Sequence, residues 1–298
     1  MLRPLSREKS NMSLDLALQT AANGATVSVF YAIIAIGFTL VFGVMGVLNL
    51  AHGELYMVGA YVVWIAYAQG GIPFPAAIAL AVAIVAGLGL AMERGLFRPM
   101  RGRPLMGLIM SIGMIFILQV FVATTWHVGL MKQVMPYIRG SLDIMGISIA
   151  YQRLLVIPAA VSAIGALWFF LRRTKTGQSL RAKAQDPEAA ALQGISMNRV
   201  DVITMAIGAG LAGFAGAFMA PIMRVDPYMG HSALVYALLV TIVGGLGSIE
   251  GALIASFIYG FMINFVTATF DSTLASIASV LLMFIVLAVR PRGIMGRA

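Results

Sequence analysis

The sequence of 298 residues contains no cysteine. This absence excludes disulfide bonds, thiolate catalysis and metal sites built from cysteine. Charged residues are also scarce, at 10% of the chain, whereas a soluble domain carries about 25%. Hydrophobic residues make up 60% of the chain, and the mean hydropathy is +0.95. Such a chain cannot cover itself with polar surface in water, so it is predicted to fold inside a lipid bilayer.

Catalytic and nucleotide-binding motifs are missing as well. The three histidines, His52, His127 and His231, lack the spacing of metal ligands, and no G-x-S-x-G motif occurs. No Gly-Lys dipeptide exists, so the glycine-rich stretch at residues 244–251 is not a Walker loop and is interpreted as a helix break. An intramembrane enzyme stays an alternative, because an acid–base set can assemble from distant helices. The simpler prediction is a chain with no cofactor, metal or catalytic residues.

Long apolar runs are what the sequence does contain. One helical crossing of a bilayer takes about 20 residues. Six of the eight runs that lack Asp, Glu, Lys and Arg suit one crossing each, and the first two runs are each 38 residues long. The sequence therefore predicts an all-α polytopic membrane protein of about eight transmembrane helices (range eight to ten), with one or more broken or re-entrant segments. The runs are residues 16–53, 55–92, 104–131, 154–171, 202–223, 227–249, 251–270 and 272–289.

The basic residues form clusters that predict the orientation of the chain. Sixteen of the twenty Lys and Arg residues lie at residues 3–9, 94–103, 172–201 and 290–297. Because Lys and Arg are enriched in cytoplasmic connections, all four clusters are predicted to be cytoplasmic, and these residues are interpreted chiefly as orientation signals. The net charge of +9 then follows from topology, and no nucleic-acid partner is expected.

This orientation divides the chain into three parts. The predicted parts are a retained cytoplasmic tail at residues 1–13, a transmembrane domain at residues 14–290 with a cytoplasmic loop at residues 172–201, and a cytoplasmic tail at residues 291–298.

The number of crossings before the second basic cluster conflicts with this scheme. Periodicity and loop signals suggest three segments there, at about residues 16–42, 54–69 and 74–92. A cytoplasmic N-terminus requires an even number of crossings. Either one segment fails to cross, and the middle one is the candidate half-span, or the N-terminus lies outside.

Polar residues interrupt the apolar stretch just before that middle segment. Residues 43–54 combine glycines with Asn49, His52 and Glu54. An ionisable group inside a membrane is costly and is a functional-site hypothesis by default. A half-helix beginning near Gly53 would also point free N–H groups into the interior. We expect Asn49, His52, Gly53 and Glu54 to line a substrate path. The alternative is that Asn49 and His52 only stabilise the break by hydrogen bonding, and that Glu54 is a first-turn residue favoured by the helix dipole.

A shorter echo of this pattern lies in the second half of the chain. Residues 225–232 again place a histidine, His231, beside a small residue ahead of an apolar run. Internal repeats are common in transporters, where the substrate path lies between the halves. An internal repeat and a chance similarity both stay open, and His231 is interpreted as a capping residue.

The loop at residues 172–201 has the pattern of a short helix. Asp186 suits the N-cap, Pro187 suits the first helical position, and Glu188 lies in the first turn. A large cytoplasmic loop on a chain without a nucleotide-binding motif suggests contact with a soluble partner. The alternative role of Glu188 is only to favour the helix dipole.

Several motifs in order resemble one known family. From about residue 14 to the C-terminus, the sequence is similar to LivH-type permeases of branched-chain amino-acid ABC importers. The resemblance does not fix the substrate, because related importers of urea, short amides and other hydrophobic amino acids look similar. The motifs that carry it are residues 31–43, 49–61, 181–200, 226–228, 244–252 and 290–293.

The resemblance implies a permease subunit of a bacterial inner-membrane importer. The implied partners are a second homologous permease subunit, two ATP-binding subunits that hydrolyse ATP, and a periplasmic solute-binding protein. Branched-chain or other hydrophobic amino acids are the implied substrates, with urea or short amides as the alternative. A stand-alone solute channel is a further alternative, which the large basic loop and the lack of a charged pore ring disfavour.

The resemblance also assigns the loop a role in coupling to the ATPase. The loop departs from older permeases, which carry a longer Glu-Ala-Ala signature, so its individual contacts stay open. The implied coupling residues are Asp186, Glu188, Ala189, Ala190 and Gly194.

Overall fold

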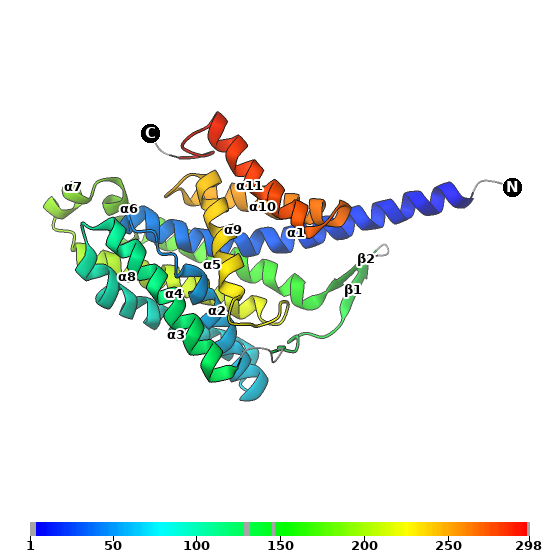
Figure 1. Ribbon diagram of the computed structural model, residues 1–298, viewed down its shortest axis with the longest axis horizontal. Coiled ribbons are helices and arrows are strands. Elements are labelled where there is room, and N and C mark those ends of the chain that lie inside the picture. The colour runs from blue at the N-terminus through cyan, green and yellow to red at the C-terminus, as the bar shows by residue number, and fades with distance from the viewer. Residues whose placement is uncertain (1–3, 128–131, 145–146, 297–298) are drawn as a thin grey trace.

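The computed structural model describes residues 4–127, 132–144 and 147–296, and helices make up most of this part of the chain (Figure 1). Short π-helical segments continue two of the helices, η1 (Trp64–Gln69) after α2 and η2 (Glu93–Phe97) after α3, and η3 (Arg98–Met100) is a 3-10 turn. The α-helices are α1 (Pro4–Met45), α2 (His52–Val63), α3 (Phe74–Met92), α4 (Pro104–Trp126), α5 (Tyr151–Arg173), α6 (Lys175–Gln185), α7 (Pro187–Leu192), α8 (Met197–Met219), α9 (Met229–Gly244), α10 (Ile249–Thr269) and α11 (Ser272–Val289).

One small β-hairpin accompanies the helices. Strands β1 (Ser141–Ile144) and β2 (Ile147–Ala150) pair antiparallel, with Ser141 opposite Ala150. The hairpin lies beside the first part of α1, where Gln19 Nε2 donates a hydrogen bond of 3.3 Å to the carbonyl oxygen of Ser148.

The lengths of the helices confirm the predicted fold class. Within the described residues, seven helices are long and apolar enough to cross a membrane, and α9 is a shorter apolar helix. The predicted broken segment is α2, a helix of 12 residues that follows the non-helical residues 46–51. The chain is therefore an all-α polytopic membrane protein with about eight spans and a broken segment between the first two long ones.

Local sequence signals explain where several helices begin. The hydroxyl of Thr174 accepts a hydrogen bond from the backbone N–H of Gly177 at the start of α6. Ser248 does the same for Gly251 in α10, and the Asp271 carboxylate does so for Leu274 in α11. These side chains satisfy backbone donors that the first helical turn leaves free, which stabilises each start by about 1 kcal/mol.

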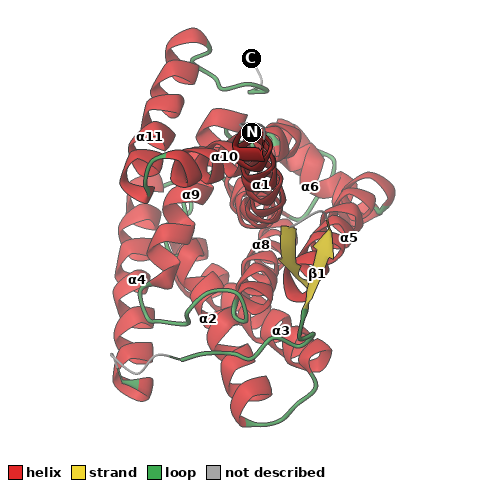
Figure 2. Cartoon of the chain, turned by 90° about the vertical axis from the view of Figure 1, so that its right-hand side faces the viewer, coloured by secondary structure: helices red, strands yellow, loops and turns green. Residues whose placement is uncertain are grey.

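Helix α1 forms the axis of the fold. In Figure 2 it is seen nearly end-on, and it packs against α5, α6, α8, α9 and α10. Its apolar part and that of α8 are the most buried of the long helices, whereas α11 is the least buried. Small residues make the close packing of α8 possible, since Gly208, Ala212 and Gly216 are all buried.

The bundle has two ends, which we name by what they carry. The loop end carries α6 and α7, and the hairpin end carries β1 and β2 (Figure 1). The segment 93–103 belongs to the loop end, because Arg101 forms ion pairs with Glu93 and Asp201 there. Residues 293–296 lie near the same end, since the N–H of Ile294 donates to the carbonyl oxygen of Val243, 2.8 Å away, and Gly247, just after α9, lies against Gly43 near the end of α1.

The first basic cluster lies apart from the other three. Helix α1 is continuous over 42 residues and starts beyond the hairpin end, while it finishes at the loop end (Figure 1). This arrangement agrees with the alternative that the N-terminus lies on the other side, because α1, the α2 segment and α3 all run between the two ends and make an odd number of segments. The cytoplasmic side of residues 1–13 stays a prediction. Residues 1–3 lie outside the described part of the chain.

Candidate functional site

The predicted short helix in the loop is present as α7. Asp186 Oδ1 accepts hydrogen bonds from the backbone N–H groups of Glu188 and Ala189, both at 2.9 Å, and Pro187 takes the first helical position. Gly194 follows the helix with a φ of +78°, a conformation that glycine adopts without strain. The capping pattern in the sequence thus predicts this helix correctly.

Helix α7 presents one free face. Asp186, Glu188 and Ala189 are exposed, and Leu192 is 89% exposed, whereas Ala190 is buried against the rest of the chain. Figure 1 shows α7 projecting from the loop end, beyond the other helices. An exposed leucine beside acidic residues on a projecting helix is a surface that a soluble partner can bind.

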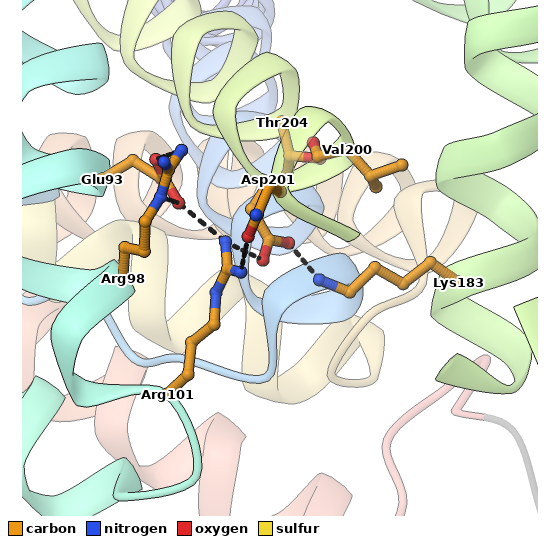
Figure 3. A network of polar contacts seen from close by, with 8 residues as sticks. Glu93, Arg98, Arg101, Lys183, Val200, Asp201 and Thr204 are labelled. Carbon is orange, nitrogen blue, oxygen red and sulfur yellow. Dashed lines mark hydrogen bonds and ion pairs between the residues drawn. The ribbon is translucent and has the colours of Figure 1, made fainter. Parts of the chain in front are cut away.

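A cluster of charges around two buried carboxylates holds the segments around α7. We call Glu93, Arg98, Arg101, Lys183 and Asp201 the charged cluster. Figure 3 shows Arg101 reaching between Glu93 and Asp201, while Lys183 approaches Asp201 from the other side. The guanidinium of Arg101 lies 2.8 Å from the Glu93 carboxylate and 2.7 Å from that of Asp201, and Lys183 Nζ contacts Asp201 Oδ1. Arg98 adds a second contact to Glu93 at 2.8 Å.

Burial separates the cluster from ordinary surface ion pairs. The side chains of Glu93 and Asp201 are 0% and 4% exposed, and that of Lys183 is 10% exposed. Charges taken out of water need close partners, and both carboxylates have two basic partners each. The interpretation of the basic residues as chiefly orientation signals is therefore incomplete, since Arg98, Arg101 and Lys183 also hold the fold together.

The charged cluster connects α6, the helix before α7, to the membrane helices. Lys183 lies on α6 three residues before Asp186, Asp201 lies in the second turn of α8, and Glu93 follows α3 directly. A displacement of α7 would thus be transmitted to α3 and α8 through ion pairs as well as through the chain. This cluster was not predicted from the sequence. The sequence indicates it only through two acidic residues, Glu93 and Asp201, each of which lies at the boundary between an apolar run and a basic segment.

The predicted path residues lie together at the start of α2, deep in the bundle. Asn49, His52, Glu54 and the backbone of Gly53 are all buried. The Asn49 side chain accepts a hydrogen bond of 3.1 Å from the N–H of Ala51, and a ring nitrogen of His52 is 3.2 Å from the carbonyl oxygen of Ile34 on α1. These contacts stabilise the non-helical segment, as the structural alternative expects.

The same side chains also have buried polar atoms without a hydrogen-bond partner in the described part of the chain. Glu54 Oε1 accepts a hydrogen bond of 2.8 Å from Gln119 on α4, but Glu54 Oε2 has no partner within the described part of the chain. Asn49 Nδ2 and His52 Nδ1 are likewise buried without a hydrogen bond to any described residue. One polar atom of each of these three side chains therefore has a partner. The second polar atom of each side chain has none among the described residues, and the contacts that stabilise the break do not explain it.

The two similar sequence patterns, at residues 43–54 and 225–232, lie next to each other in the structure. Helix α2 begins at His52 and α9 begins at Met229, and the two helices contact each other at Gly53 and Gly230. A Cβ atom at Gly53 would lie 2.1 Å from the carbonyl oxygen of Gly230, so the two backbones touch directly. We call this contact the α2–α9 crossing. His231 is exposed, and within the described residues no side-chain capping bond accompanies the start of α9.

No metal site accompanies these features among the residues that the structure describes, since no three His, Asp or Glu side chains converge. His127 is exposed at the end of α4, far along the chain from His52 and His231.

Comparison with known proteins agrees with this architecture over nearly the whole chain. The family described as "Branched-chain amino acid transport system / permease component" matches residues 20–289. LivH of Escherichia coli, a high-affinity branched-chain amino acid transport system permease protein, is 34% identical over 296 residues, covering 94% of this chain and 96% of LivH. BraD of Pseudomonas aeruginosa, which carries the same description, is 33% identical with the same two coverages.

Weaker similarity extends to another importer. The ribose import permease protein RbsC of Escherichia coli is 28% identical over 276 residues, covering 85% of this chain and 77% of RbsC. No solved structure matches the chain. The match over residues 20–289 and the level of identity to LivH and BraD leave one conclusion. The chain is a multi-pass membrane protein that belongs to the family of permease components of branched-chain amino acid transport systems.

Proposed function

We propose that this chain is the permease subunit of an ATP-driven importer for branched-chain or other hydrophobic amino acids. Its full-length similarity to LivH and BraD, both permeases of high-affinity branched-chain amino acid transport, carries this proposal. The chain has no Walker loop, so ATP is bound and hydrolysed on two separate subunits. A second homologous permease subunit and a periplasmic solute-binding protein complete the complex. The ribose import permease protein RbsC is also similar to this chain, so similarity alone does not fix the substrate, and urea or short amides are the alternative.

The proposed orientation places the loop end in the cytoplasm of a bacterial cell and the hairpin end outside the inner membrane. Three of the four basic clusters lie at the loop end, which agrees with the enrichment of Lys and Arg on the cytoplasmic side. The start of α1 is then outside, with Arg7 and Lys9 among the few basic residues there. Fusing a reporter that is active only in the cytoplasm to each terminus tests this, with activity expected at the C-terminus alone.

In this mechanism the exposed face of α7 docks into the ATP-binding subunit. Closure of the ATPase dimer pushes on Asp186–Gly194, and the charged cluster transmits the displacement to α3 and α8. The α2–α9 crossing then opens and closes the path lined by Asn49, His52 and Glu54. Non-helical backbone at this depth is tolerated beside a substrate cavity, which supports the assignment.

The Glu188→Lys variant tests the docking role. A reversed charge at a protein interface costs several kcal/mol, so ATP-dependent leucine uptake is expected to fall on the order of tenfold or more. Uptake is measured in proteoliposomes that contain the complex and its solute-binding protein. Co-purification of the ATP-binding subunits with tagged permease should weaken in parallel.

A matched control exists at the same end of the molecule. Glu250 lies in the first turn of α10, and its side chain is 60% exposed. Glu250→Lys therefore makes the same charge reversal at the N-terminus of another helix and leaves α7 unaltered. Normal uptake in Glu250→Lys together with lost uptake in Glu188→Lys supports docking. If uptake in the two variants is the same, Glu188 has no docking role and only favours the dipole of its helix. If the wild-type complex never retains an ATPase or works without ATP, the importer proposal itself fails.

A further inference from the structure

Glu54 is a buried carboxylate that the fold leaves without a counter-charge. Its side chain lies in the first turn of α2 and the residue is 2% exposed. Gln119 donates a hydrogen bond of 2.8 Å to one oxygen, and the other oxygen has no partner among described residues. Across the described parts of the chain, no Lys, Arg or His forms an ion pair with it. Both carboxylates of the charged cluster, by contrast, contact two bases each.

The surroundings of Glu54 contain a second acidic residue. Asp226 lies just before α9, whose first turn lies against Glu54 at Gly230. The ammonium of Lys132 lies 3.0 Å from the carbonyl oxygen of His127 and over the rings of Tyr61 and Trp64. A carboxylate buried at membrane depth is costly unless a cation or hydrogen-bond donors compensate it. This position therefore has an excess of acceptor atoms and a need for a cationic donor.

The free oxygen of Glu54 lies at the place where the path would open. A Cβ atom at Gly230, in the first turn of α9, would be 2.9 Å from Glu54 Oε2. This oxygen thus lies against the backbone of α9 at the α2–α9 crossing. Separation of the two helices would expose Oε2 first, while Gln119 on α4 would keep the carboxylate oriented.

We propose that the Glu54 carboxylate binds the α-ammonium group of an amino-acid substrate when the α2–α9 crossing opens. The inference rests on the proposed function and adds to it a group that selects amino acids over uncharged amides. An ammonium group supplies three donors and a positive charge, and charge-assisted hydrogen bonds to a carboxylate are about twice as strong as neutral ones. Urea, short amides and sugars have no such cation to offer.

The test compares Glu54→Gln with Glu54→Asp in the reconstituted complex. Glutamine keeps the size of the side chain and an oxygen that can accept from Gln119, but it has no charge and replaces the second oxygen with an NH2 donor. A hydrogen bond to a charged group contributes about 1.5–3 kcal/mol, so Glu54→Gln should lower the kcat/KM of leucine uptake by about 10- to 150-fold. Glu54→Asp keeps the charge and should recover part of this loss. Both variants should unfold at nearly the wild-type temperature in detergent.

Each outcome decides the question. Unchanged uptake in Glu54→Gln overturns the proposal, as does an equal loss in both variants with a lowered unfolding temperature, which makes Glu54 structural. A complex that carries acetamide or urea but not leucine, both as wild type and as Glu54→Gln, overturns it as well. Wild-type leucine uptake driven by ATP supports the proposed function independently, so failure of the Glu54 inference is distinguishable from failure of that function.

Discussion

Replacing Asp201 with asparagine is expected to lower the free energy of unfolding by about 3 kcal/mol, because it leaves a buried cation without its partner. Lys183 is 10% exposed, and Asp201 is the one carboxylate with which it forms an ion pair in the described parts of the chain. Arg101 also loses one of two partners but keeps Glu93 at 2.8 Å. The measurement is the unfolding of purified protein in detergent, followed by the loss of helical signal on heating.

A second substitution should reverse part of the damage. In Lys183→Met/Asp201→Asn neither buried charge remains, and removing a whole buried ion pair is often neutral. The double variant is therefore expected to be more stable than Asp201→Asn alone. Lys183→Met alone should be the mildest of the three, because Asp201 still contacts Arg101 at 2.7 Å. This order of stabilities separates a charge effect from simple loss of packing.

The exposed pair between Arg172 and Glu250 provides the control. These side chains are 53% and 60% exposed and 3.8 Å apart, so Glu250→Gln should change stability by less than about 0.5 kcal/mol. If Asp201→Asn is no more damaging than Glu250→Gln, the charged cluster does not hold α6 to α8. Its proposed part in transmitting the movement of α7 would then lose its physical basis.

Much of the fold could be predicted because a bilayer imposes simple rules. Runs without charge had to become helices, and a run of 38 residues had to contain a break. The position of that break followed from glycine and asparagine, and α2 indeed begins at His52. The side of the N-terminus stays a prediction, because the positive-inside rule and the odd number of segments before residue 93 point to opposite sides.

The candidate sites could be predicted only where their contacts are local in the sequence. The cap at Asp186 and the helix that follows depend on residues next to each other in the sequence, so they could be predicted. The charged cluster joins residues 93, 98, 101, 183 and 201, whose contacts exist only once α3, α6 and α8 have packed. The contact between Gly53 and Gly230 is similar, since the echo in the sequence indicated two related segments but not that they touch.

The other large expected effect is a loss of stability when Gly216 of α8 is replaced by alanine, because α8 lies very close to α2 at this residue. A Cβ atom there would lie 1.9 Å from the carbonyl oxygen of Tyr56 on α2, a distance that no side-chain movement can relieve because the obstacle is backbone. Helix α2 cannot simply retreat, since Leu55, Tyr56 and Met57 on it are fully buried. Gly216→Ala is thus expected to cost about 3 kcal/mol, at the upper end for overpacking by one methyl group.

The same substitution at Gly165 of α5 shows what a methyl group does where space is free. A Cβ atom at Gly165 would meet no atom within 4 Å, and alanine is favoured over glycine inside a helix by about 0.5–1 kcal/mol. Gly165→Ala should therefore unfold at or above the wild-type temperature, while Gly216→Ala unfolds well below it. Because α2 also begins the proposed path, leucine uptake should fall in Gly216→Ala even at temperatures where it is folded. Equal stability of the two variants would mean that α2 and α8 are not in direct backbone contact, and the α2–α9 crossing that depends on the position of α2 would have to be placed elsewhere.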